Sequence, residues 1–248
     1  MLTLDIFWVL LAVAVASYVQ NLTGFAFGLV FLAVIGIFDL LPIADAANAV
    51  TLITLTQTWI YFRTYPLTPE WRVVKPVIAP NLVGVVAGLG LLVWLSDSAL
   101  GLLKMVLGVS VVGAAVLLVV QIRPRSQLDS PASFAFTGLL SGLMGGLFST
   151  AGPPLVYKFY RQPLSPAVVR QALLVMFGIN QLARLLVVLI TGQLSLTSLG
   201  LTVLALPLQF LVMWVAQRYP LRLSPSALSR ISAVLLFMAG CGLMVTAL

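Results

Sequence analysis

The sequence predicts an all-α polytopic membrane protein with two inverted-topology repeats, each built from a broken-helix hairpin and three transmembrane helices. The composition, the spacing of the apolar runs and the likeness of the two halves predict this class. Of the 248 residues, 61% are hydrophobic and only 8% are charged, whereas a soluble chain carries roughly 25% charged residues. Such a chain could not cover a water-exposed surface with polar groups, so a lipid bilayer is the consistent solvent.

The apolar runs set the number and the ends of the expected helices. They cover approximately residues 4–20, 24–38, 43–62, 73–95, 99–121, 132–149, 153–160, 165–190, 199–217 and 226–247. The longest polar break runs from Gln121 to Pro131. It divides the chain into a first membrane repeat (1–122), a cytoplasmic linker (123–131) and a second membrane repeat (132–248).

The two halves resemble each other in order and spacing. Asn81 matches Gln209 at an offset of 128 residues, and Gln57 matches Gln181 at an offset of 124. Chance similarity between apolar sequences of low complexity is the alternative. The agreement of pattern, order and spacing favours a repeat.

The charges indicate how the repeats cross the membrane. If residues 4–38 and 132–160 each enter and return as a hairpin, each half has three further crossings and the second half is inverted. All the basic loops then lie in the cytoplasm, as the positive-inside rule requires, and Asp39, Asp45 and Asp97 lie outside. We therefore expect both termini outside. Counting each hairpin as a single crossing would split the basic loops between the two sides.

The polar breaks in the two hairpins are the expected substrate site. A broken helix exposes backbone N–H groups, and its N-terminus carries about half a positive charge, so it attracts anions. Asn21 or Thr23 can cap the returning helix, and Gly24 lets a ligand approach the backbone. The alternative is that the glycines only allow helices to pack closely. The residues expected to bind substrate at the breaks are Gln20, Asn21, Thr23, Gly24, Ser149, Thr150, Gly152 and Pro153.

Three polar residues of the flanking helices complete the expected site, namely Gln57, Gln181 and Arg184. Buried amides often serve only to tie helices together. A cation within the membrane is costly and tends to be functional, but Arg184 lies towards the outer face and could instead extend its charge to the surface. Lys158 is expected at the cytoplasmic mouth, where it could gather anions.

No catalytic, metal or cofactor site is expected, and we do not expect the protein to be an enzyme. It has no histidine and one cysteine, Cys241, which excludes an intrachain disulfide and a Cys/His metal site. No nucleophile–base pair or phosphate-binding loop is present. The net charge of +7 lies in the topology-setting loops, so nucleic acid is not an expected partner. The expected partners are a small anionic substrate and the lipid bilayer, and a homo-oligomer is compatible with both.

Three functions are compatible with these residues. The first is a secondary carrier that moves a small anion by alternating access around a midplane site. The second is a passive small-anion channel on the same scaffold. The third is a membrane partner that transports nothing, which the paired broken helices make the weakest of the three.

Two segments resemble signatures of the TauE/SafE family of sulfite and organosulfur anion exporters. They are Gln20–Gly28 (QNLTGFAFG) and Ser141–Val156 (SGLMGGLFSTAGPPLV). The resemblance covers almost the whole chain and implies an exporter of sulfite or an organosulfonate in the bacterial inner membrane. The motif positions that carry over are Gln20, Asn21, Thr23, Gly24, Ser149, Gly152 and Pro153. Ala26 stands where the family often has glycine, which implies tighter backbone access at the first break.

Overall fold

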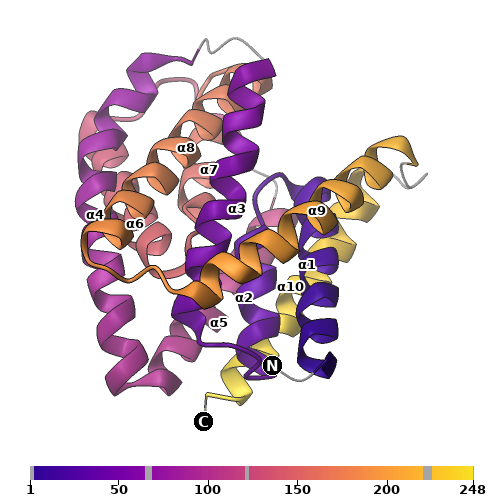
Figure 1. Ribbon diagram of the computed structural model, residues 1–248. Coiled ribbons are helices and arrows are strands. Elements are labelled where there is room, and N and C mark those ends of the chain that lie inside the picture. Colours follow the sequence, from indigo (N-terminus) through magenta and orange to yellow (C-terminus); the bar gives the residue numbers. More distant parts are fainter. Residues whose placement is uncertain (1–2, 65–68, 121–122, 220–224, 248) are drawn as a thin grey trace. The chain divides into compact units, whose positions relative to one another are not determined.

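The computed structural model describes residues 3–64, 69–120, 123–219 and 225–247, and all regular elements in these ranges are α-helices (Figure 1). In chain order they are α1 (Thr3–Thr23), α2 (Phe27–Ile37), α3 (Ile43–Thr64), α4 (Trp71–Ser98), α5 (Leu100–Val119), α6 (Pro131–Phe148), α7 (Gly152–Tyr160), α8 (Pro166–Ile190), α9 (Leu196–Arg218) and α10 (Pro225–Val245). Of these, α1, α4, α5, α6, α8 and α9 are long and apolar enough to cross a bilayer, judged by length and composition. The predicted all-α polytopic class is therefore confirmed.

Capping serines followed by proline begin two of the long helices. Ser130 precedes Pro131 at the start of α6, and its side chain accepts a hydrogen bond from the Ser133 N–H at 3.4 Å. Ser165 and Pro166 begin α8 in the same way. The serine oxygen satisfies one of the free N–H groups of the first turn, and proline has none there to lose.

The chain breaks and doubles back between α1 and α2. Gly24 has a φ of +85°, a left-handed conformation that glycine adopts without steric cost. The rings of Trp8 near the start of α1 and Phe38 after α2 stack with their centroids 6.3 Å apart. The two arms are therefore antiparallel, as the predicted first hairpin requires.

The second break lies between α6 and α7. Ser149, which ends α6, has a φ of +55°. Lys158 in the last turn of α7 contacts Ser133 in the first turn of α6, so this pair of helices also doubles back. The inversion of one repeat against the other and the depth of the hairpins in the bilayer stay predictions.

The helices pack into two units, which are described separately. Unit 1 comprises Met1–Val50, Val93–Val120 and Leu194–Leu248, and unit 2 comprises Thr51–Leu92 and Gln121–Gln193. Unit 1 thus holds α1, α2, α5, α9 and α10, and unit 2 holds most of α3 and α4 with α6, α7 and α8. Each unit contains one hairpin and draws on both halves of the sequence, so the packing units differ from the predicted repeats.

Acidic side chains of unit 1 gather at one end of it. Lys104 in α5 pairs with Asp39 after α2, with Nζ 2.6 Å from Oδ1. The Ser195 hydroxyl at the start of α9 donates to Asp45 Oδ1 at 2.6 Å in the first turn of α3. The ends of four helices therefore share one side of unit 1, and Asp39 and Asp45 lie there together.

The start of α1 and the end of α10 approach this same end of unit 1 (Figure 1). A Cβ added to Gly101 at the start of α5 would lie 2.8 Å from the carbonyl oxygen of Ala247 after α10. The Trp8–Phe38 contact brings the start of α1 to the end of α2. That this end faces the outside stays a prediction.

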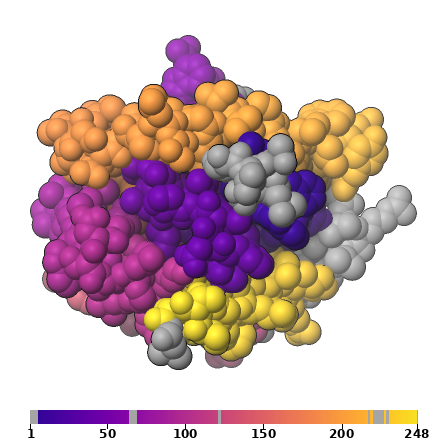
Figure 2. All heavy atoms as spheres, turned by 60° about the horizontal axis from the view of Figure 1, so that its bottom comes forward, coloured from indigo at the N-terminus to yellow at the C-terminus, as the bar shows by residue number. Residues whose placement is uncertain are grey.

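The surface of α9 is largely apolar. Val203, Leu211 and Trp214 expose 71%, 55% and 61% of their surface, and the side chains of this helix are among the orange atoms in Figure 2. Apolar side chains on the outside are the expected result when the solvent is hydrocarbon.

Unit 2 is built around a glycine seam between α4 and α6. A Cβ added to Gly84 or Gly88 of α4 would lie 2.3 Å from a backbone oxygen of α6. A Cβ on Gly142 or Gly146 of α6 would lie 2.1 or 2.3 Å from a backbone oxygen of α4. The contacts advance along both helices together, so α4 and α6 are parallel. Small residues at every fourth position let the two main chains approach this closely.

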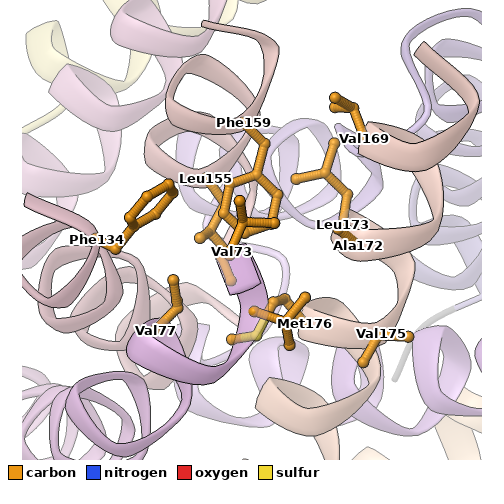
Figure 3. Packing of buried hydrophobic residues seen from close by; sticks show 12 residues of the cluster. Val73, Val77, Phe134, Leu155, Phe159, Val169, Ala172, Leu173, Val175 and Met176 are labelled. Atoms are coloured by element: carbon orange, nitrogen blue, oxygen red, sulfur yellow. The ribbon is translucent and has the colours of Figure 1, made fainter. Parts of the chain in front are cut away.

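A buried apolar cluster joins four helices of unit 2 (Figure 3). The rings of Phe134 in α6 and Phe159 in α7 meet edge to face, with centroids 6.3 Å apart. Since lipid is as apolar as these side chains, van der Waals packing rather than removal from water stabilises the cluster. Its members include Val73, Val77, Phe134, Leu155, Phe159, Val169, Leu173 and Met176.

We predict that Gly142→Ala destabilises the protein, because its new Cβ would collide with the main chain of α4. Overpacking of this kind costs about 1–3 kcal/mol. Gly90→Ala is the matched control, since a Cβ at Gly90 meets nothing within 4 Å, and alanine favours the helix by up to about 1 kcal/mol. Thermal unfolding in detergent should show a lower midpoint for Gly142→Ala alone. Equal unfolding midpoints for the two variants would contradict the close contact between the main chains of α4 and α6.

Candidate functional site

Ser149 is the centre of a buried polar cluster in unit 2. Its side chain is 1% exposed, and its N–H donates to the Gly145 carbonyl at 2.9 Å. A non-glycine residue in the left-handed region costs about 1–2 kcal/mol. Side-chain contacts must offset this cost.

Two helices supply those contacts. Ser149 Oγ lies 2.6 Å from Thr51 Oγ1 in α3 and 3.0 Å from Gln181 Oε1 in α8. Gln181 Nε2 donates to the Ser149 carbonyl at 2.8 Å, so one amide holds both the side chain and the main chain of the break. Ser149 and Gln181, both predicted from the sequence, therefore meet in the structure.

Arg184 lies beside the same break and is fully buried. Its Nε donates to the Gly146 carbonyl at 3.1 Å, and its Nη1 donates to Thr51 Oγ1 at 2.6 Å. The alternative in which Arg184 extends its charge to the surface is wrong. The C-terminal carbonyls of α6 carry partial negative charge, which stabilises a cation there. Gly146 O and Thr51 Oγ1 are neutral, so these two hydrogen bonds orient the guanidinium without cancelling its charge.

The start of α7 lies partway along α6. The Ser141 hydroxyl donates to the Ala151 carbonyl at 2.6 Å, which places the start of α7 about 15 Å from the start of α6 at 1.5 Å per residue. That is about half the thickness of a bilayer core. Thr150, Gly152 and Pro153 are all buried here.

Fewer backbone donors remain at the start of α7 than at an ordinary helix start. Pro153 and Pro154 follow Gly152, and proline has no N–H. Side chains such as Arg184 and Ser149 therefore carry more of the donor capacity near this break than the sequence reasoning assumed. Gln57 is half-buried and lies on α3, about 9 Å along the helix from Thr51.

The first break belongs to unit 1. Thr23 Oγ1 accepts a hydrogen bond from the Ala26 N–H at 3.3 Å in the turn. The N-cap of α2 is Ala26, and no side chain caps this helix, so the predicted cap by Asn21 or Thr23 is not formed. The Gly24 N–H donates to the Gln20 carbonyl at 2.7 Å, and Gln20 Oε1 accepts from Gln209 Nε2 at 3.3 Å. Asn21 is half-buried and Gly24 is exposed. That the two breaks form one site stays a prediction.

The matched amides Asn81 and Gln209 each bind a hairpin helix. Asn81 Nδ2 donates to the Gly138 carbonyl of α6 at 3.3 Å, and Gln209 binds Gln20 of α1. Asn180 Nδ2 in turn donates to Asn81 Oδ1 at 3.2 Å. Asn81 therefore ties helices together, which was the alternative to a role in binding substrate.

Sequence reasoning left Thr51 out of the expected site, although it touches both Ser149 and Arg184. A hydroxyl in an apolar helix is a weak signal, because it can bond to a carbonyl of its own helix. Thr56 does so on the same helix, donating to the Leu52 carbonyl at 2.8 Å.

A second polar cluster anchors the end of α7 to the linker. Lys158 and Arg125 donate to the Asp129 carboxylate, and Gln162 Nε2 donates to Asp129 Oδ2 at 3.2 Å. These hydrogen bonds, the one from Lys158 foremost, lower the pKa of Asp129 from 3.8 to about 2 despite its burial. The positive charge of Lys158 is therefore paired with Asp129, and Lys158 is not the anion-gathering group that we expected.

We predict that Asp129→Asn lowers the free energy of unfolding at neutral pH. Because the pKa of Asp129 is lower in the folded protein than the ordinary 3.8, the ionised carboxylate stabilises the fold above that pH. This contribution is lost as the pH falls through the folded pKa of about 2. The free energy of unfolding of wild type and variant should be measured from pH 7 to pH 3. The difference between the two should become smaller below about pH 4. Asp97→Asn removes an exposed carboxylate and is the control; a gap independent of pH would contradict the prediction.

Two comparisons relate the chain to known proteins. The family model described as "Sulfite exporter TauE/SafE" matches residues 9–243. A protein of Cupriavidus necator described as "Probable sulfite/organosulfonate exporter TauE" is 30% identical over 232 residues, which cover 94% of this chain and 91% of that relative. No solved structure matches the chain. The resemblance of the two sequence signatures is thereby confirmed, and the chain belongs to the TauE/SafE sulfite exporter family.

Proposed function

We propose that this protein is a secondary carrier that exports a small sulfur-containing anion, such as sulfite or an organosulfonate, across the bacterial inner membrane. Its family and the description of its relative support the substrate class. The observation that carries the proposal is the Arg184 guanidinium, fully buried beside the break at Ser149 and oriented by neutral oxygen atoms.

The groups around Arg184 suit an oxyanion. Sulfite and sulfonates carry negative charge on several oxygen atoms around one sulfur. A guanidinium presents planar N–H groups that match such oxygens, and the hydroxyl of Ser149 can turn to donate. The Gln181 amide adds a further donor beside them.

Exposed basic residues at the start of unit 2 would attract anions to the cytoplasmic face. Arg72 and Lys75 lie in the first turns of α4, and Arg123 lies in the linker before α6. The parallel packing of α4 and α6 brings these starts to the same end of the unit. A cluster of positive charge raises the local concentration of anions. With this end in the cytoplasm and both termini outside, the carrier would collect substrate from the inside and release it outside by alternating access.

Flux measurements distinguish a carrier from a channel. Purified protein in liposomes loaded with sulfite should give efflux that saturates with concentration, and external sulfite should stimulate exchange of labelled sulfite. A passive anion channel on the same scaffold would instead give single-channel currents proportional to voltage. A membrane partner that transports nothing would give neither.

We predict that Arg184→Gln abolishes transport, since it removes the buried positive charge. Sulfite binding by calorimetry should weaken about a hundredfold, or about 2.7 kcal/mol. Arg184→Lys keeps the charge but loses the planar donor fork, so it should retain part of the binding. Arg170→Gln at the exposed start of α8 is the control. Full transport by a correctly folded Arg184→Gln protein would contradict the proposed site.

We also predict that an inside-negative membrane potential accelerates sulfite efflux. An outward-moving anion gains ~2.3 kcal/mol per charge per 100 mV. All six carboxylates lie at helix ends or in loops. Export driven by the membrane potential would not require a relay of carboxylates within the membrane. Potassium diffusion potentials of either sign, imposed on the same liposomes, provide the measurement. An efflux rate that does not change with the imposed potential would contradict export driven by the membrane potential.

A further inference from the structure

Thr51 joins three parts of unit 2 through one oxygen atom. Its Oγ1 lies 2.6 Å from Arg184 Nη1 in α8 and 2.6 Å from Ser149 Oγ at the break after α6. The residue itself is on α3 and is 1% exposed. A hydroxyl oxygen so placed touches both the buried cation and the break that borders the proposed substrate site.

A buried guanidinium needs hydrogen-bond acceptors at every stage of a transport cycle. Leaving a charged group unsatisfied in a low-dielectric interior is costly. While substrate is bound, its negative oxygens can accept from Arg184. After release, acceptors of the protein must serve instead, and the structure places Thr51 Oγ1 on Nη1 and Gly146 O on Nε.

These two acceptors of Arg184 differ in how easily they can move away from the guanidinium. The Gly146 carbonyl belongs to the main chain of α6, whereas a threonine hydroxyl can turn away by rotation about one side-chain bond. An anionic oxygen forms hydrogen bonds roughly twice as strong as those of a neutral one. A substrate oxygen would therefore displace the Thr51 hydroxyl from Nη1, and the hydroxyl would return when the substrate leaves.

We propose that Thr51 takes the place of a substrate oxygen on Arg184 while the carrier is empty, and so allows the empty site to return across the membrane. The inference rests on the proposed function, because only a carrier has an empty return step. Net export requires that step at every turnover. Exchange of internal for external substrate does not, since the site stays occupied in both directions.

The test compares net efflux with exchange for Thr51→Val, which keeps the shape of the side chain and removes the hydroxyl. Liposomes containing labelled sulfite are diluted into buffer without sulfite for net efflux, and into buffer with unlabelled sulfite for exchange. Net efflux should fall about tenfold, the effect of about 1.4 kcal/mol on a rate. Exchange should stay within about twofold of wild type, a change of under half a kcal/mol.

Two variants serve as controls. Thr51→Ser keeps the hydroxyl and should retain both rates. Thr56→Val removes a hydroxyl that bonds within α3 and should also retain both rates. Thr51→Ala replaces Thr51→Val if the latter does not fold, as judged by size-exclusion chromatography and thermal unfolding.

The remaining outcomes overturn the inference in distinct ways. An equal fall in net efflux and exchange would mean that Thr51 binds substrate or merely shapes the site. No change in either rate would mean that the empty carrier does not need the hydroxyl. If the wild-type protein shows no exchange at all, the carrier proposal itself fails and this inference fails with it.

Discussion

The hydrogen bonds between Arg184 and the end of α6 are the interaction on which the break in unit 2 depends. Lipid offers no hydrogen bonds, so a helix that ends within the bilayer must have its carbonyls satisfied by the protein. Arg184 satisfies the Gly146 carbonyl, and Gln181 satisfies that of Ser149. The same bonds hold a cation where we propose that an anion binds. One arrangement therefore stabilises the broken helix and prepares the proposed site.

Close helix packing supports this arrangement. The parallel glycine seam sets α4 against α6 in unit 2. Gly108 and Gly240 let α5 and α10 pack closely in unit 1, where a Cβ added to either would lie 2.9 Å from the carbonyl oxygen of the other. In both cases a helix from the first half of the sequence packs on a helix from the second half. Neither half could form these contacts alone, because each supplies only one side of each seam.

The two arms of the second hairpin differ in length for a physical reason. α6 has 18 residues and α7 has nine, yet Lys158 near the end of α7 reaches Asp129 just before α6. The chain after Ser149 returns to the level of Ser141 before α7 begins. α7 therefore extends along only part of the length of α6. Its end is also anchored to the linker between the two halves of the sequence.

The sequence by itself determined the membrane class, the places where the hairpins turn and the candidacy of Ser149, Gln181 and Arg184. Composition and helix breaks can be recognised from neighbouring residues. The tertiary structure decided that Arg184 is buried, that Lys158 pairs with Asp129 and that Thr51 completes the cluster. Thr51 and Arg184 lie 133 residues apart. Contacts of this kind arise only when distant helices pack at one angle and depth, and no local pattern of residues encodes that geometry.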